Sequence, residues 1–377
     1  MKSLLRLWHH RTYTRNHTWY LDVGQRRLFV KASPNAGEAR QELAGRDMIA
    51  GIYRVPALRR TGRAGAWTVH VYERSPHVAD GLLLFDAIAS AEATQNLTLL
   101  DRFLDDILVH YRTTILATAR RIPGDQAVGK LYRHRAAPGG RLDEYYGTRT
   151  PWPLPTGPWW PDGTEIFVNG TRRRPGLPQI IETLRSDIGT SALAWAAVTQ
   201  GDPTDFNLAW SSSDGPIWFD YDTAGLNAIA GEFACFLMYQ LLHGPRLTPR
   251  YDKAAFRDHP EALHHALSGN PTVHAERTGR TIALTYQADP GPVRTHILQR
   301  YLTELVVPVA DALDVRDLSA WLCPYLLMRL LGVYNVTTLE PDDAALTLAL
   351  AADLSDRTTG IATVFPSLRS SPAEAVR

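Results

Sequence analysis

The stretch that most constrains this chain is a turn-rich loop followed by an apolar segment that contains two acidic residues, WAAVTQGDPTDFNLAWSSSDGPIWFDYDTAGLN (195–227). The loop holds Asp202 and Asn207, and the apolar segment IWFDYD holds Asp220 and Asp222. If that segment is a strand, both carboxylates lie on one face, about 6–7 Å apart, because a strand rises roughly 3.3 Å per residue. Two ionised carboxylates need cations, basic partners or water. The segment therefore predicts either a cation-binding site or a strand end that emerges into solvent.

The protein is large, and its basic and acidic residues are nearly equal in number. The 377 residues are 45% hydrophobic and 21% charged, which is enough for a large core and two domains or lobes. The net charge of +1 indicates neither a nucleic acid nor an anionic membrane as partner. Cys235 and Cys323 stand in apolar, helix-like stretches, which is typical of buried thiols in a reducing compartment. Without a signal-peptide pattern or a membrane-length apolar run, we expect a cytoplasmic protein.

The order of predicted elements indicates an α+β chain with two lobes. The segments TWYLDV and RLFVKA flank a turn at Gly24, which predicts a hairpin, and Asn35 is placed to cap the helix that follows. We predict a small β-rich N-terminal lobe at 1–75 and a larger, mainly helical lobe at 76–365. The last residues, 366–377, are predicted to be a disordered tail.

The spacing of the polar residues in the quoted stretch is specific. Asn207 follows Asp202 by five residues, and Asp220 follows thirteen later, as in the catalytic loop and metal-binding aspartate of protein kinases. In phosphoryl transfer a carboxylate accepts the proton of the attacking hydroxyl. An amide oxygen and one or two carboxylates hold Mg²⁺, which prefers oxygen ligands. We therefore predict Asp202 as the catalytic base in a loop at 199–225, and Asn207 and Asp220 as metal ligands.

These motifs resemble a known family. QGDPTDFNLAW and GPIWFDYDTAG are similar to the HGD-x4-N and IDFD signature of the aminoglycoside phosphotransferase and choline-kinase-like superfamily. Its members are small-molecule kinases with a two-lobed, protein-kinase-like fold that use ATP and Mg²⁺. The resemblance covers roughly residues 18–240 in the same order, and the remainder matches only as a helical lobe. It implies that Asp222 assists a second metal ion or the substrate.

The resemblance also implies a nucleotide site. RLFVKA resembles the strand that carries the phosphate-binding lysine, here Lys31. Either Glu42 or Glu38, on the helix that follows, would orient this lysine, and helical phase does not choose between them. VYERSPHVADGLLLFD resembles the hinge between the lobes, so adenine is expected to bind the backbone at three consecutive residues: Glu73, Arg74 and Ser75.

Two features depart from the family pattern. The family's histidine, two residues before the catalytic aspartate, is Gln200 here, and its amide can still donate a hydrogen bond. In place of a glycine-rich phosphate loop stands HHRTYTRNHTW, so arginine, threonine or asparagine side chains are expected to cover the phosphates. No P-loop motif occurs in the chain. Asp205, inside the loop, is predicted to be a solvated or helix-capping residue.

A segment rich in proline, glycine and tryptophan at 136–177 is too long for a connector and is interpreted as a functional insertion on the acceptor side. Trp159 and Trp160 could stack on rings, and Arg172 could contact the acceptor. The insertion contains five arginines against four acidic residues: Arg141, Arg149, Arg172, Arg173 and Arg174 against Asp143, Glu144, Asp162 and Glu165. This balance favours a neutral or anionic acceptor. The alternative is a surface loop whose tryptophans pack on the lobe.

Taken together, the residues and the resemblance predict an ATP- and Mg²⁺-dependent phosphotransferase acting on a hydroxyl of a small molecule, such as an antibiotic or other natural product. Two alternatives stay open. One is a kinase of a metabolite such as a sugar, an amino alcohol or a nucleoside. The other is a catalytically inactive protein that binds nucleotide, but joint retention of Asp202, Asn207, Asp220 and Lys31 argues against it.

Overall fold

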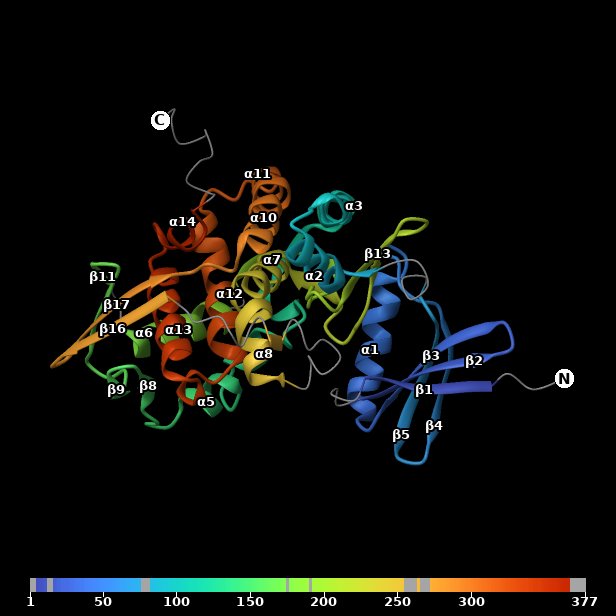
Figure 1. The fold of residues 1–377 in the computed structure, drawn as a ribbon, viewed down its shortest axis with the longest axis horizontal. Coiled ribbons are helices and arrows are strands. Elements are labelled where there is room, and N and C mark those ends of the chain that lie inside the picture. Colours follow the sequence, from blue (N-terminus) through green and yellow to red (C-terminus); the bar gives the residue numbers. More distant parts are fainter. Residues whose placement is uncertain are drawn as a thin grey trace.

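The computed structural model describes residues 5–11, 16–75, 82–173, 176–189, 192–253, 263–264 and 272–366. A β-rich part and a larger, mainly helical part lie side by side along the long axis of the molecule (Figure 1). No helix among the described residues is both long and apolar enough to cross a membrane.

The N-terminal part is an antiparallel sheet with one helix. Its strand order is β1-β2-β3-β5-β4. The strands are β1 (Leu5–Arg11), β2 (His17–Val23), β3 (Arg26–Ser33), β4 (Leu58–Ala64) and β5 (Trp67–Glu73). The predicted hairpin is confirmed, because β2 and β3 pair across a turn in which Gly24 has a φ of 60°. The left-handed backbone there suits glycine, which lacks a Cβ.

Helix α1 (Ala36–Ile49) connects the sheet to the rest of the molecule. The Asn35 side chain caps it by accepting hydrogen bonds from the N–H groups of Gly37 and Glu38, at 2.9 and 3.2 Å. The cap is confirmed, because it satisfies N–H groups that have no partner inside the helix. The helix contacts β3 and β5 of the sheet and also two strands of the C-terminal part, β12 (Leu193–Thr199) and β15 (Gly225–Ala228).

The C-terminal part is built around long apolar helices. Its helices are α2 (Leu84–Thr94), α3 (Thr98–Thr118), η2 (Gly124–Gln126), α4 (Arg133–Ala136), α5 (Arg141–Tyr146), α6 (Leu177–Gly189), α7 (Ile229–Met238), η3 (Tyr239–Leu247), α8 (Thr248–Tyr251), α10 (Pro292–Tyr301), η5 (Leu302–Val306), α11 (Val307–Ala312), α12 (Leu318–Val333), η6 (Val336–Thr338), α13 (Pro341–Leu354) and α14 (Gly360–Val364). Helix α7 is buried along its whole length and packs against α12. Cys235 and Cys323 are buried free thiols, as predicted.

Short strands join these helices. The order β15-β12-β7 forms one small sheet and β14-β13-β6 another. Their remaining strands are β6 (Leu82–Leu83), β7 (Arg120–Pro123), β13 (Leu208–Ser211) and β14 (Gly215–Trp218). The prediction of a strand over IWFDYD is wrong beyond Trp218, because β14 ends at that residue. Asp220 has a φ of 55°, a left-handed conformation that interrupts the alternation of a strand. Asp220 and Asp222 therefore do not lie on one strand face.

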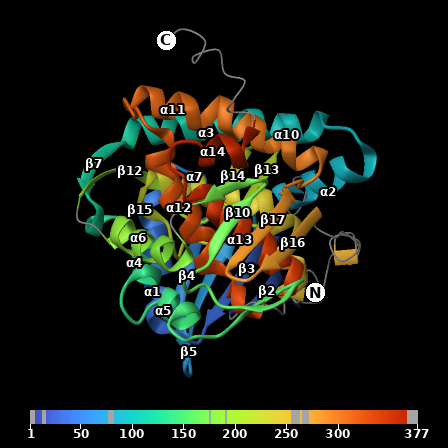
Figure 2. The ribbon, with the colours of Figure 1, turned by 90° about the vertical axis from the view of Figure 1, so that its left-hand side faces the viewer.

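The insertion folds into secondary structure at the end of the molecule that is remote from the N-terminal sheet (Figure 1). Its strands are β8 (Trp152–Leu154), β9 (Gly157–Trp159), β10 (Glu165–Val168) and β11 (Thr171–Arg173). Strand β10 pairs in parallel with β17 (Thr281–Gln287), which forms a hairpin with β16 (Thr272–Thr278). Figure 2 looks onto this end, with β10, β16, β17 and α13 toward the viewer. Two distant segments of the chain thus complete one sheet.

Four parts of the predictions fall outside the described residues. Residues 76–81 of the segment expected to form the hinge, and Arg174 of the insertion, are two of them. Of the predicted tail, residues 367–377 lie outside them, and so do residues 12–15 of the segment expected to cover the phosphates.

Candidate active site

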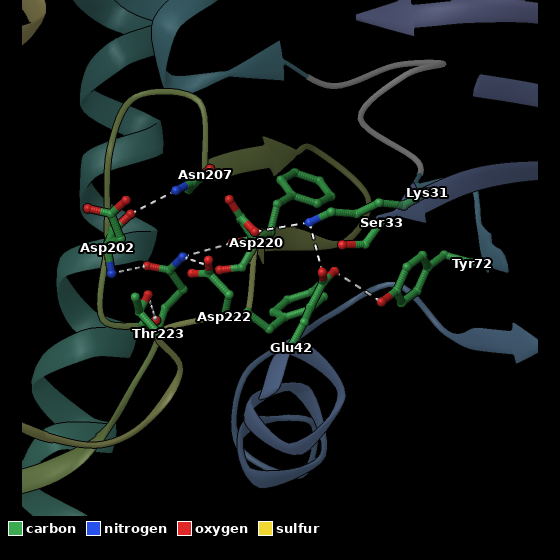
Figure 3. Close-up of polar contacts among 12 residues, drawn as sticks. Lys31, Ser33, Glu42, Tyr72, Asp202, Asn207, Asp220, Asp222 and Thr223 are labelled. Atoms are coloured by element: carbon green, nitrogen blue, oxygen red, sulfur yellow. Dashed lines mark hydrogen bonds and ion pairs between the residues drawn. The ribbon is translucent and has the colours of Figure 1, made fainter. Parts of the chain in front are cut away.

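Lys31 stands at the centre of an ion-pair network between the two parts of the chain. Its Nζ lies 2.9 Å from Oε2 of Glu42 and 3.2 Å from Oδ1 of Asp220 (Figure 3). Burial acts to lower the pKa of Lys31, but the charges of Asp220 and Glu42 outweigh it and raise that pKa. The lysine is therefore held protonated, and the structure pairs it with Glu42.

The helical phase of α1 explains this pairing. Residues 39, 42, 45 and 49 form the buried face of α1, so Glu42 points under the sheet. Tyr72 on β5 donates a hydrogen bond of 3.2 Å to the other oxygen of Glu42. With both carboxylate oxygens engaged, Glu42 holds Lys31 in one position.

Gln200 organises the catalytic loop through both ends of its amide. Its Nε2 donates to the main-chain carbonyls of Phe219 and Asp220, at 2.8 and 2.6 Å. Its Oε1 accepts from the main-chain N–H of Asp202 at 2.7 Å. The expectation that glutamine can donate in this place is confirmed. Gly201, with a φ of 90°, follows directly, and a Cβ there would collide with the carbonyl of Thr223.

Asn207 is oriented by the same loop. Its Nδ2 donates to the carbonyl of Asp202 at 2.9 Å, and its own carbonyl accepts from the N–H of Phe219 at 2.9 Å. Because the amide nitrogen is engaged, the amide oxygen is the atom that can meet a cation. Figure 3 shows Asp202 and Asn207 on one side of Asp220 and Lys31 on the other.

Asp202 has two side-chain partners that the sequence did not reveal. The thiol of Cys235 on α7 donates a hydrogen bond of 3.0 Å to Oδ1 of Asp202. The Nη2 atom of Arg329 on α12 lies 3.4 Å from the same oxygen. The side chain of Asp202 is 31% exposed and that of Arg329 is 5% exposed. The carboxylate is therefore held from the core side and open on the other. The signal for Arg329 was a charged residue inside the apolar stretch CPYLLMRLLGVY.

Asp222 forms an ion pair with Lys130, a residue that precedes α4 and was also not predicted. Burial and the nearby charge of Asp220 raise the pKa of Asp222, and Lys130 opposes them. Both side chains are about one quarter exposed. Lys130 is thus a second lysine, beside Lys31, placed next to an aspartate of the loop.

Glu232 anchors the loop from below. This fully buried residue of α7 accepts hydrogen bonds from the Thr199 hydroxyl at 2.7 Å, the Gly201 N–H at 2.8 Å and the Tyr111 hydroxyl at 3.1 Å. Burial raises the pKa of Glu232 to about 7, and the three hydrogen bonds limit the rise. The sequence signal was one acidic residue in the apolar run GEFACFLMYQLL.

Asp205 is also an anchor, so its prediction as a solvated or capping residue is wrong. The residue is fully buried, and its Oδ2 lies 3.0 Å from Nη2 of Arg294 on α10. Gln240 on η3 donates to its other oxygen. A buried carboxylate needs such partners, and both come from segments more than thirty residues away along the chain.

A cavity lies between the N-terminal sheet and the loop after β14. It is lined by Lys31, Glu42, Asn207 and Asp220, and by the three residues expected at the hinge: Glu73, Arg74 and Ser75. The N–H groups of Glu73 and Arg74 already donate to the carbonyls of Ala57 and Arg27, at 2.8 and 3.0 Å. These two N–H groups are therefore engaged in the lobe itself, which limits the backbone bonds expected for adenine.

Asn207, Asp220 and Asp222 offer the oxygen ligands that suit Mg²⁺. Within the part of the chain that the structure describes, no three His, Cys, Asp or Glu side chains form a preformed metal cage. Mg²⁺ in nucleotide sites is usually held by one or two carboxylates together with phosphate oxygens. The donor set fits that mode of binding.

The three side chains of the insertion that were expected to contact the acceptor lie on or beside its short strands, and contact with an acceptor stays a prediction. Trp159 is 2% exposed, packs edge-on against Trp152 at 5.8 Å and donates its indole N–H to Thr164. Trp160 is partly buried against the same core, and Arg172 pairs with Glu165 on the adjacent strand. None of the three lines the cavity described above. The alternative, that the tryptophans pack on the lobe, holds for Trp159, whose large apolar surface is buried here.

Comparisons with known proteins place the fold. No family model matches the chain, and no curated protein matches it. A solved structure from Ralstonia eutropha, named as a putative aminoglycoside phosphotransferase, aligns with 98% of this chain and 94% of its own, at 11% identity and a TM-score of 0.50. A thermostable mutant of another aminoglycoside phosphotransferase, in its apo form, aligns over 97% and 96% at 13% identity and a TM-score of 0.47. At this identity the likeness to the Ralstonia eutropha structure shows the fold alone, and the predicted two-lobed, kinase-like α+β class is confirmed.

Proposed function

We propose that this protein transfers the γ-phosphoryl group of ATP, together with Mg²⁺, to a hydroxyl group of a small molecule. One continuous set of contacts supports the proposal. Lys31 pairs with the side chain of Asp220, and the main chain of Asp220 accepts from Gln200. Gln200 in turn fixes the N–H of Asp202. A phosphate-binding lysine and a catalytic base are thereby held in one frame, as phosphoryl transfer by positioning requires.

In this proposal the nucleotide occupies the cavity beneath the N-terminal sheet. Lys31, oriented by Glu42, holds the α- and β-phosphates, and the hinge residues 73–75 border the base. Asn207, Asp220 and Asp222 would bind Mg²⁺, which when bound neutralises charge on the phosphates. Lys130, paired with Asp222, adds positive charge on the same side.

Asp202 would act on the acceptor. Its carboxylate accepts the hydroxyl proton as the acceptor oxygen bonds to the γ-phosphorus and the bond to the β-phosphate oxygen breaks. Cys235 and Arg329 hold the carboxylate in place through Oδ1. Since that oxygen is engaged, Oδ2 is the atom we assign to the proton transfer.

The experiment that tests this function separates nucleotide binding from phosphate transfer. Binding of ATP and of ADP is measured by calorimetry with and without Mg²⁺. ADP release is then measured against panels of antibiotics, sugars, amino alcohols and nucleosides. We expect Mg²⁺-dependent ATP binding and acceptor-dependent ADP release, the latter lost in Asp202→Asn.

Three results would redirect or reject the proposal. Tight ATP binding without transfer to any acceptor, equal in the parent and in Asp202→Asn, would favour the inactive nucleotide-binding protein. Absence of ATP binding at any Mg²⁺ concentration would reject the proposed function. Phosphorylation of a sugar, amino alcohol or nucleoside rather than an antibiotic would identify a metabolite kinase.

A further inference from the structure

Basic side chains gather next to Asp202, on the side of the helical lobe. Arg329 on α12 lies 3.4 Å from the Asp202 carboxylate. Arg135 and Arg141 donate to the carbonyl of Gly332, at 3.1 and 3.3 Å, and Gly332 lies one helical turn beyond Arg329. We call Arg135, Arg141 and Arg329 the arginine cluster.

The charge of the arginine cluster is not balanced by protein carboxylates. Among the described residues, Asp202 is the one carboxylate within ion-pair distance of any of the three. Burial and repulsion by Arg329 and Arg141 lower the pKa of Arg135 to about 10, while Asp202 acts in the opposite direction. Of the three neighbouring guanidinium groups, Arg329 alone is thus close to a carboxylate, and Arg135 lies near the charges of both other arginines. In a partly desolvated place this is unfavourable unless an anion joins them.

His243 provides an independent observation at the same place. It is 1% exposed, and neither ring nitrogen has a hydrogen-bond partner among the residues that the structure covers. The ring packs edge-on against Tyr334 at 5.6 Å, and burial, then Arg329 and Arg135, lower the pKa of His243. A neutral imidazole thus has an unsatisfied donor and acceptor near two arginines. The buried Nε of Arg329 also has no hydrogen-bond partner in the part of the chain that the structure describes.

The backbone around His243 is unusual. The residue lies on η3, a π-helix of nine residues, and single π-turns are frequent at functional sites. The same element carries Gln240, which holds Asp205 of the catalytic loop. The geometry of η3 therefore places His243 and a support of the catalytic loop on one element.

We propose that the arginine cluster and His243 bind an anionic group of the acceptor, a carboxylate or a phosphate, so that the acceptor hydroxyl meets Asp202. This inference rests on the proposed function and names the substrate class of that site. Guanidinium groups match the planar geometry of carboxylate and phosphate oxygens and bind them through paired hydrogen bonds. A polycationic aminoglycoside would be repelled by the same residues.

A second source of the same chemistry is the γ-phosphate of ATP. The acceptor is favoured because Lys31, which lines the nucleotide cavity, already stands beside Asp220. The arginine cluster instead adjoins Asp202, the residue assigned to the acceptor hydroxyl. The experiment distinguishes the two sources.

The test uses matched pairs of hydroxyl compounds with and without an anionic group. The pairs are sugar phosphates and sugars, hydroxy acids and their amides, and nucleoside monophosphates and nucleosides, with aminoglycosides as cationic probes. ADP release at saturating ATP should give anionic members a kcat/KM about 10- to 100-fold above their partners, as expected for hydrogen bonds to a charged group. Preference for neutral or cationic members would overturn the inference.

Variants assign the effect to the arginine cluster. Arg135→Gln should raise the KM for the anionic member about 10-fold or more and leave the KM for ATP unchanged. Arg141→Gln should act in the same direction and serves if Arg135→Gln does not fold. Arg316→Gln removes the charge of an arginine whose side chain is 87% exposed and is the matched control, with no expected change. A raised KM for ATP in Arg135→Gln would assign the cluster to the γ-phosphate and contradict the proposal.

A binding measurement covers the case in which no panel member is phosphorylated. Inorganic phosphate is titrated by calorimetry into the parent and Arg135→Gln, each saturated with ADP and Mg²⁺ so that the nucleotide site is filled. Phosphate binding that is weakened in Arg135→Gln supports the inference. Absent or equal phosphate binding overturns it, while failure of ADP itself to bind rejects the proposed function instead.

Discussion

The catalytic loop and the insertion both carried polar and aromatic residues that indicated function, yet the structure uses them differently. In the loop, hydrogen bonds from Gln200 and Asn207 converge on Asp202 and Asp220. In the strands of the insertion, β8 to β11, contacts lead into the body of the lobe, whereas Arg141, on the helix α5 before them, belongs to the arginine cluster. Arg173, for example, pairs at 2.7 Å with the buried Asp353 of α13.

The difference teaches that spacing carries more information about function than composition does. The interval from Asp202 to Asn207 to Asp220 is the spacing of the protein-kinase catalytic loop, and the structure brings these residues together around Lys31 and Gln200. Tryptophans and arginines serve a ligand or a core equally well, because an indole has a large apolar surface and a guanidinium can pair with a buried carboxylate. The predictions that follow test whether the two regions differ in this way.

The largest effect is expected from Asp202→Asn in the loop. The change removes the proton acceptor while keeping the shape of the side chain, so kcat should fall by about 10²–10⁴-fold. The affinity for ATP should stay within about twofold, since Asp202 does not line the nucleotide cavity. Steady-state kinetics and nucleotide titration measure the two quantities. A variant with near-parental kcat would show that another group takes the proton.

Trp159→Ala should affect stability rather than catalysis. Removing this buried indole should lower the free energy of unfolding by about 3–5 kcal/mol, the usual cost for a large aromatic residue in a core. The KM values for ATP and for the acceptor should stay unchanged in the protein that remains folded. Denaturant unfolding and kinetics at low temperature provide the comparison. A raised KM for the acceptor, together with the stability of the parent, would show that Trp159 contacts the acceptor.

The anchor beneath the loop, Glu232, should make the stability of the protein depend on pH. The pKa of Glu232 is raised from its usual value near 4.5 to about 7. The folded protein therefore holds this proton more tightly than the unfolded chain does. The protonated carboxyl of Glu232 therefore contributes to the free energy of unfolding in full below pH 4.5. This contribution, at most about 3 kcal/mol, is lost as the pH rises toward 7.

Glu232→Gln removes this titration. The difference in unfolding free energy between parent and variant should change steadily between about pH 4.5 and pH 7, with the parent losing stability relative to the variant. Chemical denaturation at a series of pH values measures it. Parallel curves for the two proteins would mean that the Glu232 carboxyl keeps its ordinary pKa.

The smallest effect is expected from Arg172→Gln in the insertion. Its ion pair with Glu165 lies on an exposed hairpin, where such pairs contribute about 0–1 kcal/mol. Both KM values should match the parent, and the melting temperature should move little. An acceptor KM raised severalfold would show that the hairpin does reach the substrate.

The sequence was a good guide to elements whose determinants are local. The β2–β3 hairpin follows from Gly24 and alternating apolar residues, and the cap of α1 follows from Asn35 alone. Local motifs likewise predicted Lys31, Asp202 and Asn207 as site residues, and their roles stay predictions.

The sequence did not reveal features that depend on distant segments or on a single backbone angle. The left-handed φ of Asp220 ended a strand that looked continuous through Asp222. Arg329 and Lys130 reach the loop from positions 127 and 92 residues away along the chain. The parallel pairing of β10 with β17, which removes the insertion from the cavity, has no local signal either.

The most direct test of the central claim compares Asp220→Asn with Asp222→Asn by titrating ATP at increasing Mg²⁺ concentrations. Asp220 contacts Lys31 and has the kinase-like spacing, whereas Asp222 is paired with Lys130. We expect Asp220→Asn to lose most of the Mg²⁺-dependent gain in ATP affinity and Asp222→Asn to lose less. Equal, Mg²⁺-dependent ATP affinity in the parent and in Asp220→Asn would contradict the assignment of this loop as a metal–nucleotide site.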